Sequence, residues 1–141
     1  YTKGAYRSGD LDLVMTGYLL EKLPKAMAKI GFKVSQGRHY THPKCAHIFV
    51  EFSSPPVAIG DDYKITPQEM KVEQKIIRLY SPTDCIRDRL ASYIHFSARE
   101  CLDQAVLVAQ AHPFDSKKVE KWCREEGSPA AFREFSELLR R

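Results

Sequence analysis

The chain has 141 residues, of which 43% are hydrophobic and 28% are charged, and its formal net charge is +4 at pH 7. These ordinary values exclude a mostly disordered chain, and the mild positive charge allows an anionic ligand such as a nucleotide or RNA without requiring one. No apolar run approaches the roughly 20 residues of a membrane span, and no signal-peptide pattern is present at the start.

The first 80 residues alternate between strand and helix patterns. Residues 9–15 alternate polar and apolar side chains, which predicts a strand. Apolar residues recur on one face over 18–30, which predicts a helix, and Gly31 occupies the usual position of a left-handed C-cap. Further strands are expected over the ranges 32–40, 46–53, 63–65 and 72–80.

The remaining residues have helical patterns. Four helices are expected, each opened by a capping residue: Ser81, Ser97, Asp115 and Ser128. The sequence therefore predicts an α+β fold, with a small mixed β-sheet core over 1–80 and a C-terminal helical bundle over 81–141. Four cysteines lie far apart with no C-x-x-C pair, which favours a reduced, cytoplasmic setting.

Two aspartates on the first predicted strand are the most informative residues. Side chains alternate along a strand, so Asp10 and Asp12 share one face while Leu11 and Leu13 share the other. Two carboxylates held this close repel each other, and a bound divalent cation such as Mg²⁺ would remove the conflict. The alternative is a solvated strand end whose acids happen to alternate.

Glu51, inside the apolar strand 46–53, is a third acidic candidate. An acid on such a strand is costly to bury unless it is paired, hydrogen-bonded or bound to a metal, although its face could instead be exposed. If the two strands are neighbours, the three carboxylates converge. Two Mg²⁺ ions roughly 3.5–4 Å apart would then satisfy them and create a phosphoryl-transfer site.

The stretch Tyr6–Val14, YRSGDLDLV, resembles the core of the polymerase-β-type nucleotidyltransferase superfamily, whose members carry a D-h-D strand (h is apolar) and a third acid on a later strand. It is most similar to small prokaryotic nucleotidyltransferases related to AbiEii-type toxins and minimal MNT proteins. The resemblance implies Mg²⁺-dependent transfer of a nucleoside monophosphate from a nucleoside triphosphate such as ATP. The acceptor would be a hydroxyl of RNA, a partner protein or a small molecule, in a toxin–antitoxin or phage-defence role.

The resemblance also implies roles for individual residues. Asp10 and Asp12 would hold two metal ions, and Glu51 would bind the catalytic one and help to deprotonate the acceptor. The residues implied to contact the nucleotide are Arg7, Ser8, Arg89 and Asp103. Alternatively, Arg89 is a solvated helix arginine paired at i,i+4 with an acid, and Asp103 only caps the helical bundle.

One departure from the family pattern concerns phosphate binding. The family carries a Gly-Gly or Gly-Ser pair at a helix start about ten residues or more before the first acid, and no such pair stands between Tyr1 and Asp10. Either the pair lies upstream of Tyr1, or the chain is a degenerate relative. The rival function is therefore a catalytically inactive binding or antitoxin protein, and a metal-dependent hydrolase is a third possibility.

Two other groups of residues are interpreted as structural. His39, His42, Cys45 and His47 fall in one predicted turn and its arms, where His39 and His47 could face each other, rather than in two separated ligand pairs as in structural zinc sites. Trp122 lies among basic residues but is expected to pack on the bundle, with those residues forming a solvated face.

Overall fold

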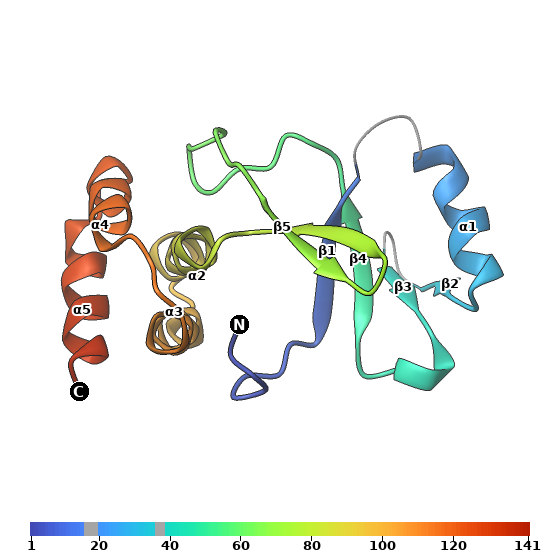
Figure 1. The fold of residues 1–141 in the computed structure, drawn as a ribbon, viewed down its shortest axis with the longest axis horizontal. Coiled ribbons are helices and arrows are strands. Elements are labelled where there is room, and N and C mark those ends of the chain that lie inside the picture. Colours follow the sequence, from blue (N-terminus) through green and yellow to red (C-terminus); the bar gives the residue numbers. More distant parts are fainter. Residues whose placement is uncertain (16–19, 36–38) are drawn as a thin grey trace. The chain divides into compact units, whose positions relative to one another are not determined.

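A computed structural model describes residues 1–15, 20–35 and 39–141. Within these ranges the fold is mixed α+β, with six β-strands and five α-helices (Figure 1). The chain divides into two compact units, one formed by 7–57 and the other by 58–141 together with 1–6. The change from strands to helices falls near Ser81, as the sequence predicts, whereas the division between the units falls at 57/58.

The unit of 7–57 is built on a four-stranded sheet with the order β1-β4-β3-β2. β1 pairs in parallel with β4, whereas β4 with β3 and β3 with β2 are antiparallel. The elements are β1 (Asp10–Val14), α1 (Leu23–Lys29), β2 (Lys33–Val34), β3 (His39–Thr41) and β4 (Phe49–Ser53), with 3-10 turns at Leu20–Lys22 and Pro43–Cys45.

Helix α1 packs on one face of this sheet. Met27 of α1, Tyr40 of β3 and Val50 of β4 are buried together and form the core of the unit. Gly31 follows the helix with a φ of +88°, which a residue with a side chain rarely adopts, so the predicted C-cap is confirmed. Alternation then places the side chains at odd positions of β4, including Glu51, on the face opposite α1.

The single strand predicted over 32–40 is wrong. β2 and β3 are two strands that pair with each other, Lys33 opposite Thr41 and Val34 opposite Tyr40. The two strands are antiparallel, and the Ser35 N–H donates to the His39 carbonyl at 2.8 Å. Residues 35–39, Ser-Gln-Gly-Arg-His, do not alternate, and this polar run with a glycine is the signal in the sequence that separates the two strands.

The unit of 58–141 contains the helices α2 (Pro82–Phe96), α3 (Arg99–Ala111), α4 (Ser116–Glu125) and α5 (Pro129–Leu139), and a hairpin of β5 (Gln68–Val72) and β6 (Lys75–Leu79). Its core is apolar and fully buried, and includes Ile59, Ile86, Leu90, Leu102, Val119 and Phe135. The strand predicted over 63–65 is absent, since the described residues there lie outside any strand.

The helix starts follow the predicted caps in part. The Ser81 hydroxyl accepts the Asp84 N–H at 3.0 Å, and the Asp115 carboxylate accepts the Lys118 N–H at 2.9 Å. Ser97 does not cap α3. It ends α2 in a left-handed conformation with a φ of +55°, and α3 begins after Ala98.

Residues 1–6 join the second unit through polar contacts of Tyr1. The Tyr1 hydroxyl donates to the Tyr80 carbonyl at 2.5 Å, and His112 Nε2 donates to the Tyr1 carbonyl at 2.8 Å. None of the helices in the described ranges has the length and apolarity needed to cross a bilayer.

Candidate functional site

The predicted acids lie on one face of the sheet in the unit of 7–57. β1 and β4 are parallel neighbours, and their register sets Asp12 beside Glu51 and Asp10 beside Phe49. Paired residues of neighbouring strands point to the same face, so all three carboxylates share the face opposite α1. The condition set by the sequence, that these two strands are neighbours, is therefore met.

A third strand extends this row. β3 pairs with β4 so that His39 lies opposite Glu51, which gives the row Asp12, Glu51, His39 across three strands. Neighbouring strands are roughly 4.8 Å apart. We call Asp10, Asp12, Glu51 and His39 the carboxylate face.

Ser8 contacts the first acid of this face. Its hydroxyl donates to Asp10 Oδ1 at 2.6 Å and so orients that carboxylate, while its predicted contact with the nucleotide stays a prediction. Arg7, the other residue before the acids, is exposed. Both lie in the same compact unit as the three acids.

The carboxylate face has the right donor atoms for a hard cation, but its side chains do not converge as they stand. Carboxylate oxygens are the ligands that Mg²⁺ prefers, and the register sets three such groups on neighbouring positions. Among the described residues, however, no group of three or more His, Cys, Asp or Glu side chains is arranged to hold a metal ion.

Arg89 and Asp103 belong to the unit of 58–141. Arg89 on α2 makes an ion pair with Asp88 at 2.6 Å, and its Nη1 donates to Gln104 Oε1 at 3.3 Å. Burial acts to lower the pKa of Arg89, but the hydrogen bond to Asp88 outweighs it, so the pKa is raised. Asp103 is exposed on α3. Arg89 is half-buried and pairs with the adjacent Asp88 rather than with an acid four residues away, so it is not the solvated i,i+4 arginine of the alternative, and the nucleotide contacts remain predictions.

The histidines of residues 39–47 do not form a hairpin pair as the sequence suggested. His39 lies opposite Glu51 rather than His47, and His42 accepts the Lys44 N–H through Nδ1 at 3.0 Å. Sequence reasoning assigned no role to His39. The register of β3 with β4 is what identifies His39, and this register is known only once the order of the strands is known.

A second cluster of charged residues lies inside the unit of 58–141. The buried Arg87 donates to Asp84 at 2.8 Å and to Asp62 at 2.5 Å, and its guanidinium lies over the Trp122 ring. The hydrogen bond from Arg87 holds the pKa of Asp62 below its usual value. Burial acts to raise the pKa of Asp84, but hydrogen bonds from Lys118, Ser81 and Arg87 outweigh it and lower it.

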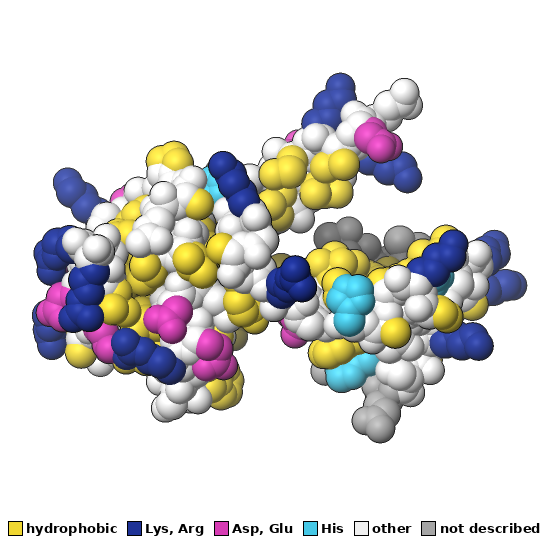
Figure 2. All heavy atoms as spheres, turned by 90° about the horizontal axis from the view of Figure 1, so that it is seen from below, with side chains coloured by type: hydrophobic (Ala, Val, Ile, Leu, Met, Phe, Trp, Pro, Cys, Tyr) yellow, Lys and Arg dark blue, Asp and Glu magenta, His cyan; other side chains and the backbone are white. Residues whose placement is uncertain are grey.

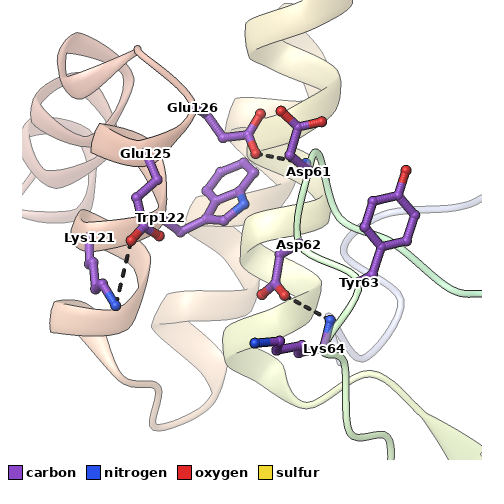
Figure 3. A pocket seen from close by; sticks show the side chains of 8 residues that line it. All are labelled: Asp61, Asp62, Tyr63, Lys64, Lys121, Trp122, Glu125 and Glu126. Carbon is purple, nitrogen blue, oxygen red and sulfur yellow. Dashed lines mark hydrogen bonds and ion pairs between the residues drawn. The ribbon is translucent and has the colours of Figure 1, made fainter.

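A pocket of about 590 Å³ lies next to this cluster (Figure 3). Its lining consists of Asp61, Asp62, Tyr63, Lys64, Lys121, Trp122, Glu125 and Glu126. The acids of the lining have partners within the protein: Asp62 pairs with Arg87, Glu125 with Lys121, and Glu126 with His95 and the Asp61 N–H. These contacts hold the 58–64 segment against the helices. They explain the positions of the acids, so no bound ligand is needed to explain them.

The interpretation of Trp122 as a packing residue is confirmed, since only 3% of it is exposed and its indole N–H donates to the Ile59 carbonyl. Two basic residues of α4 form ion pairs along the helix, Lys121 with Glu125 and Arg124 with Glu120, while Lys118 pairs with the buried Asp84. Figure 2 shows Lys and Arg mixed with Asp and Glu over α4 and α5, as on a solvated face.

Comparisons of the chain with protein-family models, with curated proteins and with solved structures find no match. The interpretation of the site therefore depends on the register and contacts of the carboxylate face.

Proposed function

We propose that the chain is a Mg²⁺-dependent nucleotidyltransferase whose nucleotidyltransferase core contains the carboxylate face. The observation that carries this proposal is the parallel pairing of β1 with β4, which sets Asp12 beside Glu51 with Asp10 on the same face. Three acids on separate positions of two strands have the chemistry of a two-metal site.

In the proposed reaction, the oxygen of an acceptor hydroxyl forms a bond to the α-phosphorus of a nucleoside triphosphate. The bond from that phosphorus to the bridging oxygen breaks, and pyrophosphate leaves. When bound, Mg²⁺ would neutralise the triphosphate and polarise the phosphorus–oxygen bonds. Asp10 and Asp12 would hold the ions, and Glu51 would bind the catalytic ion and accept the hydroxyl proton. Ser8 orients Asp10 through its 2.6 Å hydrogen bond.

The acceptor would be RNA, a partner protein or a small molecule, and the setting a toxin–antitoxin or defence system in the cytoplasm. Arg7 and Ser8, which belong to the same unit as the three acids, would contact the nucleotide. The second candidate is a catalytically inactive binding protein. The absence of a converged metal-binding group among the described side chains favours that alternative.

The test is incubation of the chain with labelled nucleoside triphosphates, Mg²⁺ and bulk cellular RNA or protein. We expect transfer of the label to RNA or protein together with release of pyrophosphate. A hydrolase would cleave the triphosphate without labelling either acceptor. The Asp10→Ala, Asp12→Ala double variant should lose transfer by at least about 100-fold. Glu21→Ala is the matched control, because Glu21 is an exposed acid of the same unit outside the sheet.

Absence of transfer with the unaltered chain, or transfer that survives the double substitution, would contradict the proposal. Because Asp10 and Asp12 are exposed, their replacement should leave the free energy of unfolding within about 0.5 kcal/mol of the parent. A folded but inactive variant therefore separates loss of chemistry from loss of structure.

A further inference from the structure

We propose that His39 is a positioning residue that holds the Glu51 carboxylate in place on the carboxylate face. The inference rests on the proposed function in so far as Glu51 belongs to the site. Its starting point is the register, in which His39 of β3 lies directly opposite Glu51 of β4 while Asp12 of β1 lies on the other side of Glu51.

The contact is a hydrogen bond. His39 Nε2 lies 3.2 Å from Glu51 Oε2. An ionised carboxylate can only accept, so Nε2 must carry the proton and donate it. The bond therefore selects the Nε2–H form of the imidazole and fixes one oxygen of Glu51 relative to β3.

A second contact orients the imidazole ring. The His39 ring lies 4.5 Å from the Phe49 ring, centroid to centroid, with 34° between their planes. Phe49 precedes Glu51 by two residues on the same face and is paired with Asp10. The Phe49 ring thus packs against the imidazole, while Nε2 of His39 faces the Glu51 carboxylate.

Because His39 and Glu51 are partly exposed, their hydrogen bond should contribute little to the free energy of unfolding. The side chains are 40% exposed for His39 and 23% exposed for Glu51. Hydrogen bonds between such partly exposed groups are screened by water. A partner that orients a ligating carboxylate, by contrast, typically changes metal affinity by 10–100-fold when it is removed.

The experiment measures divalent-cation binding by calorimetry with Mn²⁺ as the probe, together with label transfer. His39→Ala should weaken Mn²⁺ binding by about 10-fold or more and slow transfer, with little change in urea unfolding. His39→Gln, whose amide N–H can replace Nε2–H, should recover most of both. His47→Ala is the matched control, since it removes an exposed imidazole of the same unit.

A readout independent of metal comes from long-range ¹H–¹⁵N NMR at about pH 8. His39 should be in the Nε2–H form, and Glu51→Ala should shift its ring nitrogens while His47 stays unchanged. An Nδ1–H form of His39, or His39 ring nitrogen shifts that do not change in Glu51→Ala, would overturn the proposal. Mn²⁺ affinity that is equal in His39→Ala and His47→Ala would overturn it as well. If the unaltered chain binds no Mn²⁺ and transfers no label, the proposed function fails, while the NMR result still decides whether His39 holds Glu51.

Discussion

Asp84 in the unit of 58–141 and Asp12 in the unit of 7–57 are carboxylates in opposite surroundings. The Asp84 side chain is only 4% exposed and accepts hydrogen bonds from Ser81, Arg87 and Lys118. Asp12 is exposed on an open sheet face beside Glu51. A buried acid must be matched by cations and donors, since an unmatched one would be very costly.

The comparison separates two uses of the same chemical group. The acids around Arg87 have donors that account for their position, and they stabilise the junction between the 58–64 segment and the helices. The acids of the carboxylate face also have polar partners, Ser8 for Asp10 and His39 for Glu51, but they place like charges on neighbouring strand positions. Substitutions in the unit of 58–141 are therefore expected to change the free energy of unfolding. Substitutions on the carboxylate face of the unit of 7–57 are expected to change the rate of transfer.

The largest expected effect comes from Arg87, whose side chain is 2% exposed. Arg87→Met should lower the free energy of unfolding by about 3–5 kcal/mol, because it removes the buried cation that pairs with both Asp84 and Asp62. Urea unfolding followed by circular dichroism measures the loss. Arg78→Met is the matched control: its ion pair with Glu69 is exposed, so the cost should stay below about 1 kcal/mol. Equal losses in the two variants would contradict a structural role for the buried cluster.

A smaller loss of stability is expected at low pH. The pKa values of Asp62 and Asp84 are lowered in the folded protein, so the unfolded chain binds protons more readily than the folded one. Their contribution to stability is thus fully present above about pH 4 and is lost as the pH falls through the lower folded values. Unfolding curves between pH 6 and pH 2 measure this loss.

The matched variant for the acid experiment is Asp84→Asn, which removes one of the two titrating groups. Its stability should fall less steeply below pH 4 than that of the parent. An identical slope in the variant and the parent would show that Asp84 does not titrate with a lowered pKa.

The smallest of the stability effects concerns the start of α2. Ser81→Ala removes the hydroxyl that accepts the Asp84 N–H, and should cost about 1 kcal/mol. Ser128 also precedes a helix, but its side chain makes no capping hydrogen bond. Ser128→Ala should therefore change the free energy of unfolding by less than about 0.5 kcal/mol. A greater loss from Ser128→Ala than from Ser81→Ala would rule out this account of the caps.

Local signals in the sequence predicted much of this architecture. The Ser81 and Asp115 caps, the glycine at the end of α1 and the strands carrying Asp10 and Glu51 follow from nearest-neighbour chemistry. Strand alternation correctly put Asp10 and Asp12 on one face. The break between β2 and β3 was missed, although the polar run over 35–39 contains a glycine and does not alternate.

Contacts between distant residues could not be predicted in the same way. His39 faces Glu51 only because β3 and β4 are antiparallel in one particular register, and a shift of one residue would put it on the other face. Arg87 looked like any helix arginine, and its burial depends on Asp62 reaching it from 25 residues earlier. Both pairings are consequences of tertiary structure.

The most direct test of the account compares Glu51→Gln with Asp84→Asn, measuring both label transfer per folded molecule and the free energy of unfolding. Glu51→Gln should lose transfer by at least about 100-fold while its stability changes by less than about 1 kcal/mol. Asp84→Asn should lose about 1.5–3 kcal/mol of stability and keep its transfer rate per folded molecule. Transfer that persists in Glu51→Gln, or that disappears in fully folded Asp84→Asn, would contradict the account.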